Sequence, residues 1–373
     1  MRILHVTPTY LPFKGGIETF IYSLCTHLKE LAGIDSVVCI CTRDESWRFT
    51  LRAPDAVPVV TVPVRGPNGF KFLPTMTTLV SQADIVHLHE PQFAGIAFHF
   101  AVHDYGVPVV ASTHGGFFHT RRLWLFKRLY SRTVLPWILR RLDLVIASSE
   151  SDERTFRPLA SHLVRVDNGV NFCLFHAATA TKRRTAQSFV YFGRLSRNKR
   201  IELICHTLAK VRREHPSITL HLIGEDFDRL TPRLKKLCAD LGICNIVHFH
   251  GAVEQDALLA QVSQAQFFIS ATEYEGFGLA IIEAMAAGCI PVVSRIAPLT
   301  NFIVDGQQGF LVDFSDPDRA ADKISKIIAL NESERSRISQ KAAERAQDFS
   351  WDRKVNEFID AYQYAAARRN VSG

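Results

Sequence analysis

The chain has 373 residues, of which 47% are hydrophobic and 22% charged, and it carries a formal net charge of +7 at pH 7. This length is too great for one ordinary domain and suits two domains of about 150 to 200 residues each. The composition is that of a soluble globular protein, and no stretch reaches the roughly 18 uncharged apolar residues that a membrane-spanning helix needs. The positive charge favours anionic partners such as nucleotides, phosphates, nucleic acid or acidic lipid.

The N-terminus, MRILHVTPTYLPFKGG, has neither the long apolar region nor the small-residue cleavage site of a signal peptide, so we interpret its start as a first β-strand. Eight cysteines are scattered through mostly apolar runs without the paired spacing of metal ligands. Together these features predict a cytoplasmic protein with reduced thiols and without zinc.

The first part of the chain alternates short apolar runs with helical segments. In chain order the expected strands are RILHVTP, SVVCICT, DIVHLHE, PVVASTHG, LVIASS and HLVRVDNGV, with helices expected at 16–32, 93–105 and 121–142. This alternation predicts a parallel, doubly wound sheet. We assign residues 1–172 to this N-terminal domain.

Residues 173–187, CLFHAATATKRRTAQ, lose this periodicity and are predicted to be a linker. The alternation resumes over 188–350, the expected C-terminal domain. Its expected strands are SFVYFGRLS, ITLHLIGE, IVHFHG, AQFFISA, IPVVS and GFLV, with helices at 199–214, 229–241 and 254–263. The tail from about 351 to 373 is predicted to be a further helix. We therefore expect an α/β protein whose two Rossmann-like domains face a central cleft, where ligands of such sheets bind.

The segment EYEGFGLAIIE carries two acids around a glycine-rich turn that should open a helix near Leu279. Gly276 and Gly278 let the backbone approach a ligand, and the free N–H groups of a helix N-terminus suit a phosphate. Glu275 in the loop can accept hydrogen bonds from sugar hydroxyls, and Glu283, one turn into the helix, can bind the vicinal diol of a ribose. The alternative is a loop that leads into a core helix, with Glu283 solvated on its outer face.

The strand SFVYFGR ends at Gly193 and Arg194, and Lys199 follows five residues later. Cations at a strand end are well placed to bind a diphosphate whose negative charge grows as it leaves. We expect no magnesium site of the Asp-x-Asp kind, so these side chains and backbone dipoles would have to neutralise the diphosphate. Alternatively, Arg194 and Lys199 are ordinary surface charges.

Three further features lie at expected strand ends. Gly15-Gly16 could approach a phosphate or an acceptor, and its spacing differs from the Gly-x-Gly-x-x-Gly of nicotinamide sites. His114, in STHGG, could hydrogen-bond a sugar hydroxyl or stabilise developing charge. His87 and His89, in HLHE, resemble a metal pair, but we interpret them as alternating residues of a strand.

The acid-free stretch between Asp104 and Asp143 contains the aromatic and basic segment RRLWLFKRLYSRTVLPWILRR, residues 121–141. This composition is typical of a segment that lies on an anionic membrane surface. Its apolar residues could equally pack on the first sheet and leave the arginines solvated. Nucleic-acid binding also fits the charge, but no recognised nucleic-acid module accompanies it.

Four motifs together resemble the retaining glycosyltransferases of the GT-B fold, family 4. They are GGIE, THGG, YFGR with Lys199, and EYEGFGLAIIEAMAAGCIPVVS, and their order and spacing match over nearly the whole chain. More narrowly, VVASTHGGFFHT, YFGRLSRNK and EGFGLAIIEAMAAG look like the bacterial α-mannosyltransferases of exopolysaccharide assembly. Those enzymes transfer mannose from GDP-mannose to cellobiosyl-diphosphopolyprenol.

The resemblance implies a role for each matching position. Glu275 would hold the donor sugar, Glu283 the ribose, and Arg194 with Lys199 the diphosphate, while His114 would contact the sugar near its reacting carbon. Backbone would complete the site at Gly15 and Gly16, beside the phosphate or the acceptor, and at Gly193, Gly276, Phe277, Gly278 and Leu279 beside the donor.

The resemblance also implies the reaction. It would proceed with retention of configuration, without a metal or other cofactor, onto a lipid-linked saccharide at the inner face of the plasma membrane. The C-terminal helix would cross back onto the first domain. One departure is LIGEDFD, where many relatives have Gly-x-Gly and this chain has Gly224-Glu225-Asp226, which leaves the contacts to the base open.

Several alternatives stay open at this point. The first is a transferase of the same fold that uses a UDP-sugar such as UDP-glucose, or a soluble acceptor. A non-catalytic nucleotide-sugar sensor or membrane scaffold would be expected to have lost Lys199 or a motif glutamate, and the chain keeps both. A glycosidase is disfavoured, because two acids on one loop and helix do not flank a glycosidic bond.

Overall fold

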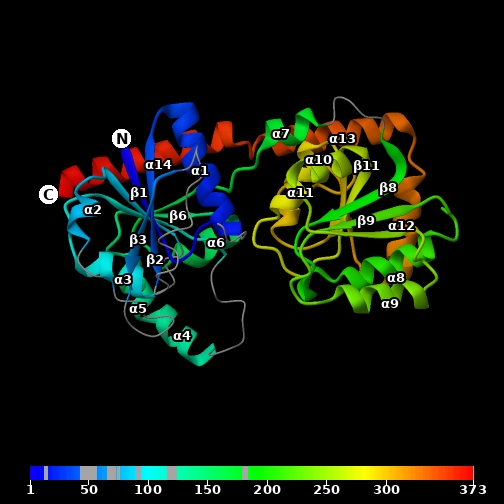
Figure 1. Ribbon diagram of the computed structural model, residues 1–373, viewed down its shortest axis with the longest axis horizontal. Helices are drawn as coiled ribbons and strands as arrows, with labels where there is room; N and C mark the ends of the chain where they lie inside the picture. Colours follow the sequence, from blue (N-terminus) through cyan, green and yellow to red (C-terminus); the bar gives the residue numbers. More distant parts are fainter. Residues whose placement is uncertain are drawn as a thin grey trace. The chain divides into compact units, whose positions relative to one another are not determined.

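The computed structural model describes residues 1–11, 16–42, 57–64, 73, 76–89, 94–115, 124–178 and 184–372. The chain divides into two compact units (Figure 1). The first unit comprises residues 1–169 and 351–373, and the second unit comprises residues 170–350.

The boundary between the units lies before the predicted linker 173–187. Helix α7 (Phe172–Ala177) occupies the start of that segment, and β8 (Thr185–Phe192) begins before its end. Phe175 is buried in the core of the second unit, where its ring stacks on Phe192 at a centroid distance of 6.2 Å. The units divide after residue 169, three residues before the predicted end of the first domain, because Val170, Phe172 and Phe175 already pack in the core of the second unit.

The first unit contains a seven-stranded sheet in the order β3-β2-β1-β4-β5-β6-β7, and every pairing in it is parallel. Its strands are β1 (Arg2–Thr7), β2 (Asp35–Thr42), β3 (Val59–Pro63), β4 (Ile85–His89), β5 (Val109–Ser112), β6 (Leu144–Ala147) and β7 (Leu163–Arg165). The six strands predicted for this part are confirmed. The seventh, β3, was not predicted. Among the described strands it pairs with β2 alone, and its terminal Pro63 suits an edge position.

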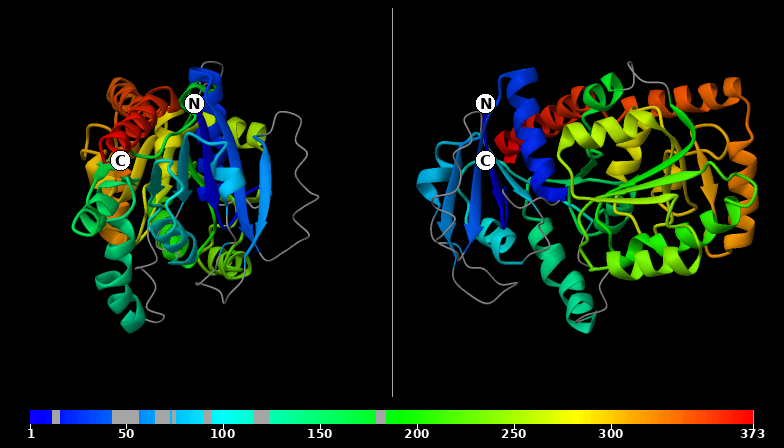
Figure 2. Two further views of the ribbon diagram at one scale, coloured as in Figure 1. Left: turned by 90° about the vertical axis from the view of Figure 1, so that its left-hand side faces the viewer. Right: turned by 45° about the vertical axis from the view of Figure 1, so that its right-hand side comes forward.

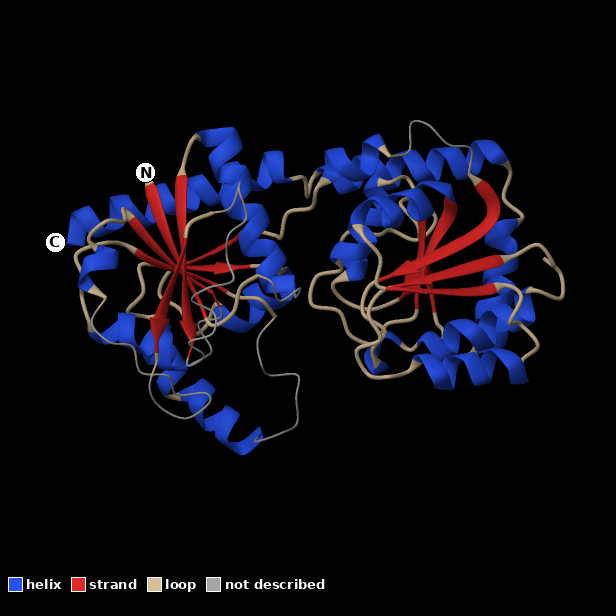
Figure 3. Ribbon diagram, viewed as in Figure 1, coloured by secondary structure: helices blue, strands red, loops and turns tan. Residues whose placement is uncertain are grey.

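Helices cover both faces of this sheet (Figures 1 and 3). One face carries α1 (Gly16–Ala32) and α14 (Trp351–Ser372), which pack side by side. The core on the other face includes residues of α2 (Thr77–Val80), α3 (Ala94–Val102), α5 (Val134–Leu139) and α6 (Glu150–Phe156). The buried Phe358 and Tyr362 hold α14 in this core, so the C-terminal helix belongs to the first unit.

The single helix predicted over 121–142 is wrong for the described residues. Two helices, α4 (Trp124–Arg132) and α5, are separated by Thr133, which has non-helical torsion angles. The break has a physical cause in Pro136, which lacks an N–H and is tolerated only in the first turn of a helix. In both views of Figure 2, α4 projects away from the sheet of the first unit.

The second unit contains a six-stranded parallel sheet in the order β10-β9-β8-β11-β12-β13. Besides β8, its strands are β9 (Thr219–Ile223), β10 (Val247–Gly251), β11 (Ala265–Ser270), β12 (Ile290–Ser294) and β13 (Phe310–Val312). All six were predicted. The strand order reverses direction between β8 and β11, so the carboxyl ends of these two strands form the switch point at which such sheets bind ligands.

Two helical layers enclose this second sheet (Figure 3). One core includes residues of α8 (Ile201–Val211), α9 (Thr231–Asp240) and α12 (Pro317–Ile328). The other includes residues of α7, α10 (Gln255–Gln264), α11 (Leu279–Ala286) and α13 (Glu332–Gln347). Both sheets are thus doubly wound, which confirms the predicted fold class.

No helix among the described residues combines the length and the hydropathy that crossing a bilayer requires.

Candidate functional site

The loops that follow β8 and β11 bring two predicted site residues into contact. Lys199 belongs to the 3-10 turn η3 (Arg197–Lys199), whereas the sequence predicted that it would begin a helix. Its Nζ donates to the Glu275 carboxylate at 2.5 Å, and each side chain is 19% exposed. A cation and an acid predicted to bind different parts of one ligand therefore lie side by side at the switch point of the second sheet.

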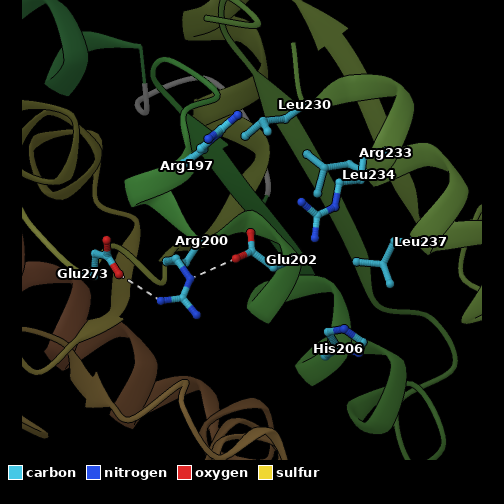
Figure 4. Close-up of a pocket in the computed structure, with 9 residues that line it drawn as sticks. All are labelled: Arg197, Arg200, Glu202, His206, Leu230, Arg233, Leu234, Leu237 and Glu273. Atoms are coloured by element: carbon cyan, nitrogen blue, oxygen red, sulfur yellow. Dashed lines mark hydrogen bonds and ion pairs between the residues drawn. The ribbon is translucent and has the colours of Figure 1, made fainter. Parts of the chain in front are cut away.

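Backbone and side-chain bonds hold these two loops together. The carbonyl of Asn198 accepts from the backbone N–H of Glu273 at 2.9 Å, and its side-chain amide donates to the carbonyl of Tyr274 at 3.3 Å. Arg200 has a positive φ of 50° and donates to Glu273 and to Glu202, each at 2.9 Å (Figure 4). The left-handed backbone at Arg200 ends the η3 turn and starts α8, so Lys199 stays outside the helix.

A pocket of about 420 Å³ lies beside the η3 turn (Figure 4). It is lined by Arg197, Arg200, Glu202, His206, Leu230, Arg233, Leu234, Leu237 and Glu273. Neither Lys199 nor Glu275 lines it, so this pocket and the ion pair are separate features of the same turn.

Gly193 and Gly224 bring the ends of β8 and β9 into close approach. Both have positive φ angles, 136° and 142°, and a Cβ on Gly224 would lie 2.0 Å from the carbonyl oxygen of Gly193. Arg194 follows and is exposed, with its guanidinium 5.0 Å from the centre of the Phe227 ring. Among the described residues no acid pairs with Arg194, so its charge is available to an anionic ligand.

The sequence contains two Asp-x-Asp triplets, although we expected no magnesium site of that kind. In the first, Asp226 accepts from the first backbone N–H groups of α9 at 2.6 and 2.9 Å, and Asp228 accepts from the backbone N–H of Arg197 at 2.8 Å. In the second, Asp316 caps α12 and Asp318 pairs with a lysine of α8. These carboxylates therefore serve the local fold, and Asp226 is committed to its helix.

The Gly276–Leu279 segment leads into α11 as predicted. Gly278 has a φ of 100°, and its carbonyl accepts from the backbone N–H groups of Ile281 and Ile282 at 3.0 and 3.1 Å. The N–H groups at the start of the helix have no acceptor within it, which makes them available to a phosphate. Phe277 is 8% exposed and packs in the core, so any contact of this residue with a donor would come from its backbone.

Glu283 lies one turn into α11 and is partly buried rather than solvated on an outer face. Burial raises the pKa of Glu283 to about 8. Within the part of the chain that the structure describes, no hydrogen bond or ion pair reaches its side chain. A partly buried carboxyl group without a partner can hydrogen-bond a vicinal diol, either as donor or as acceptor.

His114 follows β5 in the first unit and lies at the end of a row of histidine rings. Its Nε2 is 3.1 Å from Nδ1 of His89, and Nε2 of His89 is 3.1 Å from Nδ1 of His5. Burial lowers the pKa of His114 to about 3, so the ring is neutral. The Phe20 ring packs against it edge-on at 4.8 Å.

Asp152, in α6, fixes the backbone on both sides of His114. Its carboxylate accepts from the Thr113 hydroxyl at 2.5 Å, from the Gly115 N–H at 3.0 Å and from the Ser148 hydroxyl at 3.0 Å. Sequence reasoning missed this residue, although Ser149, three residues earlier, caps α6 and marks a helix start.

The remaining predicted residues lie as follows. Gly16 begins α1 in the first unit, and Gly15 lies outside the described residues. Gly16 and His114 belong to the first unit, whereas Gly193, Arg194, Lys199, Glu275–Leu279 and Glu283 belong to the second unit.

Comparison with known proteins gives one family model for each of the two parts of the chain. Residues 14–173 match the family model for glycosyltransferase family 4, and residues 177–345 match the model for glycosyl transferases group 1. The GDP-mannose:cellobiosyl-diphosphopolyprenol alpha-mannosyltransferase of Xanthomonas oryzae pv. oryzae (strain PXO99A) is 30% identical over 98% of this chain and 97% of its own length. The protein of the same name from Komagataeibacter xylinus is 27% identical over 99% and 94%.

Solved structures give the same fold. Anabaena HepE in complex with UDP superposes with a TM-score of 0.77 at 19% identity, over 97% of this chain and 99% of that one. Sucrose-phosphate synthase from Thermosynechococcus elongatus does so with a TM-score of 0.75 at 20% identity, over 99% and 100%. The chain belongs to the family 4 glycosyltransferases, and its two parallel-sheet domains have the GT-B fold.

Proposed function

We propose that this glycosyltransferase moves mannose from GDP-mannose onto a polyprenyl-diphosphate-linked, cellobiosyl-like oligosaccharide during exopolysaccharide assembly. The observation that carries the proposal is the similarity to mannosyltransferases of that name over the full length of both chains. The site geometry supports a nucleotide-sugar donor. Two cations (Arg194 and Lys199), the free N–H groups at the start of α11 and two carboxyl groups (Glu275 and Glu283) belong to the segments that follow β8 and β11.

The second unit would bind the donor. Arg194 is exposed and pairs with no acid among the described residues, and Lys199 follows it on the next turn, so both can neutralise a diphosphate. The N–H groups at the start of α11 would add to this. Glu275 would accept hydrogen bonds from the sugar, and Glu283 would bind the ribose diol.

His114 in the first unit would contact the sugar near its reacting carbon, with Gly15 and Gly16 beside the phosphate or the acceptor. A neutral imidazole can donate a hydrogen bond to a sugar oxygen without adding a charge that repels an oxocarbenium-like centre. The neutral state of His114 supports this role.

The proposed reaction retains the configuration of the anomeric carbon. The bond from that carbon to the diphosphate oxygen breaks, and the acceptor oxygen bonds to the same face while its proton passes to an oxygen of the leaving diphosphate. No side chain serves as the nucleophile. Lys199 and Arg194 would stabilise the charge that develops on the leaving group, and we expect no metal to be required.

A membrane-bound acceptor is supported by the surface around α4 and α5. A pocket of about 520 Å³ is lined by Ser131, Arg132, Thr133, Pro136, Trp137, Arg140, Arg141 and Leu159, which include three arginines and no acid. Leu129 on α4 is 64% exposed. The buried Leu135, Ile138 and Leu139 of α5 instead pack in the core of the first unit. The sequence offered two interpretations of residues 121–141, packing on the sheet and attachment to a membrane. The first applies to α5, and we propose the second for α4. We propose peripheral attachment at the cytoplasmic face through α4 and this pocket.

Thermal-shift and donor-hydrolysis measurements with GDP-mannose, UDP-glucose, UDP-galactose and UDP-N-acetylglucosamine test the donor assignment. We expect the largest shift and the fastest release of nucleoside diphosphate with GDP-mannose. A preference for a UDP-sugar would favour the alternative transferase, and binding without turnover in the presence of a lipid-linked acceptor would favour a non-catalytic sensor.

A further inference from the structure

A row of three imidazoles runs from the core of the first unit to His114. His5 is fully buried on β1, and His89 is 2% exposed at the end of β4. The two contacts in the row, His5 Nδ1 to His89 Nε2 and His89 Nδ1 to His114 Nε2, both measure 3.1 Å. No carboxylate takes part in either contact, so the row has nothing to compensate an imidazolium charge.

A hydrogen bond between two neutral imidazoles needs an N–H on one ring and a lone pair on the other. Because His89 has only one N–H, its two bonds must run in the same direction along the row. In one direction, all three rings carry their proton on Nδ1, and His114 is left with a free Nδ1–H. In the other, all three carry it on Nε2, and His114 is left with a free Nδ1 lone pair.

The far end of the row distinguishes these two states. Nε2 of His5 is buried and finds no hydrogen-bond partner among the residues that the structure describes. In the Nδ1–H state, Nε2 of His5 carries a lone pair and no proton. In the Nε2–H state it carries a proton and is a hydrogen-bond donor. Among backbone groups, a buried N–H is left unpaired more rarely than a buried acceptor, and a donor without an acceptor loses its hydration without compensation. The Nδ1–H state is therefore the more stable one.

We propose that His5 and His89 are positioning residues that hold His114 in its Nδ1–H tautomer, so that it presents a fixed N–H donor to an oxygen of the sugar substrate. The sugar as recipient rests on the proposed function, whereas the tautomer rests only on the row itself. Burial lowers the pKa values of all three rings, which keeps the row neutral across the working pH range.

A metal site is the competing interpretation of this cluster, since ligand nitrogens of His5, His87 and His89 lie within 4.8 Å of one another. The two nitrogens of His87 already lie 2.9 Å from the Tyr362 hydroxyl and 2.7 Å from the Ser112 hydroxyl. Both nitrogens of His89 are also engaged. A divalent cation would have to break several of these bonds in a buried region where none of the rings pairs with an acid.

The direct test is nitrogen NMR of the intact protein with ¹⁵N-labelled histidine, in which long-range ¹H–¹⁵N correlations identify the protonated nitrogen of each ring. Signals are assigned by their loss in single histidine variants. We expect His5, His89 and His114 to carry the proton on Nδ1, with no change when Zn²⁺ is added to chelator-treated protein. An Nε2–H tautomer or an imidazolium at His114, or stoichiometric Zn²⁺ binding at the cluster, would overturn the proposal.

Two nearly isosteric variants test the consequence for transfer. His89→Asn keeps an N–H donor at the place of Nδ1, whereas His89→Asp supplies an acceptor that draws the His114 proton onto Nε2. At pH 8 we expect kcat to be about tenfold lower in His89→Asp than in His89→Asn, with little change in donor KM. Equal kcat values in two folded variants would overturn the proposal. If His89→Asp does not fold, the tautomer of His114 measured in the wild type still tests the proposal. The same measurement tests it if the protein turns over no donor, and in that case only the proposed function fails.

Discussion

The Lys199 ammonium and the Glu275 carboxylate form an ion pair of 2.5 Å between the loops that follow β8 and β11. Each side chain is only 19% exposed, so neither charge is fully solvated and each is stabilised by the other. A diphosphate arriving at Lys199 and a sugar arriving at Glu275 would meet groups that are already held in place. We propose that the pair forms part of the donor site.

Lys199→Ala is expected to lower kcat by about 10²- to 10³-fold, because it removes a positive charge that stabilises the leaving diphosphate. It also leaves the Glu275 carboxylate without its partner, which should cost about 1 to 3 kcal/mol of stability. Initial rates at saturating donor and calorimetric melting measure the two effects. Lys210→Ala is the matched control, because Lys210 pairs with the exposed Asp318 in the same unit. Near-normal turnover in Lys199→Ala would remove Lys199 from the mechanism.

Glu275→Ala should impair transfer more than folding, because a loop carboxylate contributes little to a core. The double variant Lys199→Ala/Glu275→Ala should be more stable than the sum of the two single effects, since it leaves no unpaired charge. Glu273→Ala, on the same loop but 58% exposed, is the control and should retain most activity. A collapse of the melting temperature in Glu275→Ala alone would instead favour a structural role.

Glu283 should make the stability of the second unit depend on pH. Its pKa is about 8 in the folded protein against 4.5 for the free group. Between these values the folded state holds a proton that the unfolded state has released, so stability falls as pH rises from about 4.5 to about 8, by at most about 1.4 kcal/mol per pH unit. Glu283→Gln removes this loss, so it should be more stabilised relative to the wild type at pH 8 than at pH 5.

Calorimetric melting at pH 5, 6.5 and 8 without ligand checks this dependence. Glu214→Gln, which changes an exposed acid of the same unit, should shift the melting temperature equally at all three values. If the Glu283→Gln difference is also constant with pH, the carboxyl group is not held in its protonated form.

Gly224→Ala should disrupt the donor site by displacing the loop that carries Arg194. The added Cβ would lie 2.0 Å from the Gly193 carbonyl oxygen, and the φ of 142° is itself strained for a residue with a side chain. We expect a loss of about 3 kcal/mol or more and weak nucleotide binding. Gly242→Ala, which also has a positive φ but faces open space, should cost only about 1 kcal/mol and leave nucleotide binding unchanged. Equal melting temperatures in the two variants would contradict the close approach.

Arg132→Glu/Arg140→Glu should weaken attachment to anionic liposomes, because it reverses two of the three charges of the pocket between α4 and α5. Lys236→Glu/Lys326→Glu makes the same change in net charge on exposed residues of the second unit and should leave binding nearly intact. Co-sedimentation with vesicles containing phosphatidylglycerol, at low and at moderate salt, measures both. Equal binding by both double variants would show that only net charge matters, and no binding by the wild type would contradict the membrane assignment.

Much of the fold could be predicted because its strands are uninterrupted apolar runs with helical segments between them. The parts that could not be predicted depend on single residues, which either interrupt a regular pattern or adopt an unusual backbone conformation. Pro136 divides a segment whose aromatic and basic pattern resembles one long helix. Arg200 adopts a left-handed backbone conformation, which an arginine in a sequence does not predict. This conformation excludes Lys199 from α8.

The residues of the candidate site could be predicted as types at strand ends, but their partners could not. Lys199 and Glu275 are 76 positions apart, and His5 and His89 are 84 apart. Contacts of this range depend on sheet order and register, which periodicity does not supply. His5 lies inside an ordinary apolar strand, so only its place beside His89 reveals its relation to His114.

The measurement that tests the central claim most directly is transfer of label from GDP-[¹⁴C]mannose to cellobiosyl-diphosphopolyprenol in vesicles, with the anomeric configuration of the product read by NMR. We expect α-linked mannose to appear in the lipid fraction with the wild type, almost none to form with Lys199→Ala, and equimolar UDP-glucose not to compete. Preferred transfer from a UDP-sugar, a β-linked product, or labelling only of a soluble acceptor would contradict it.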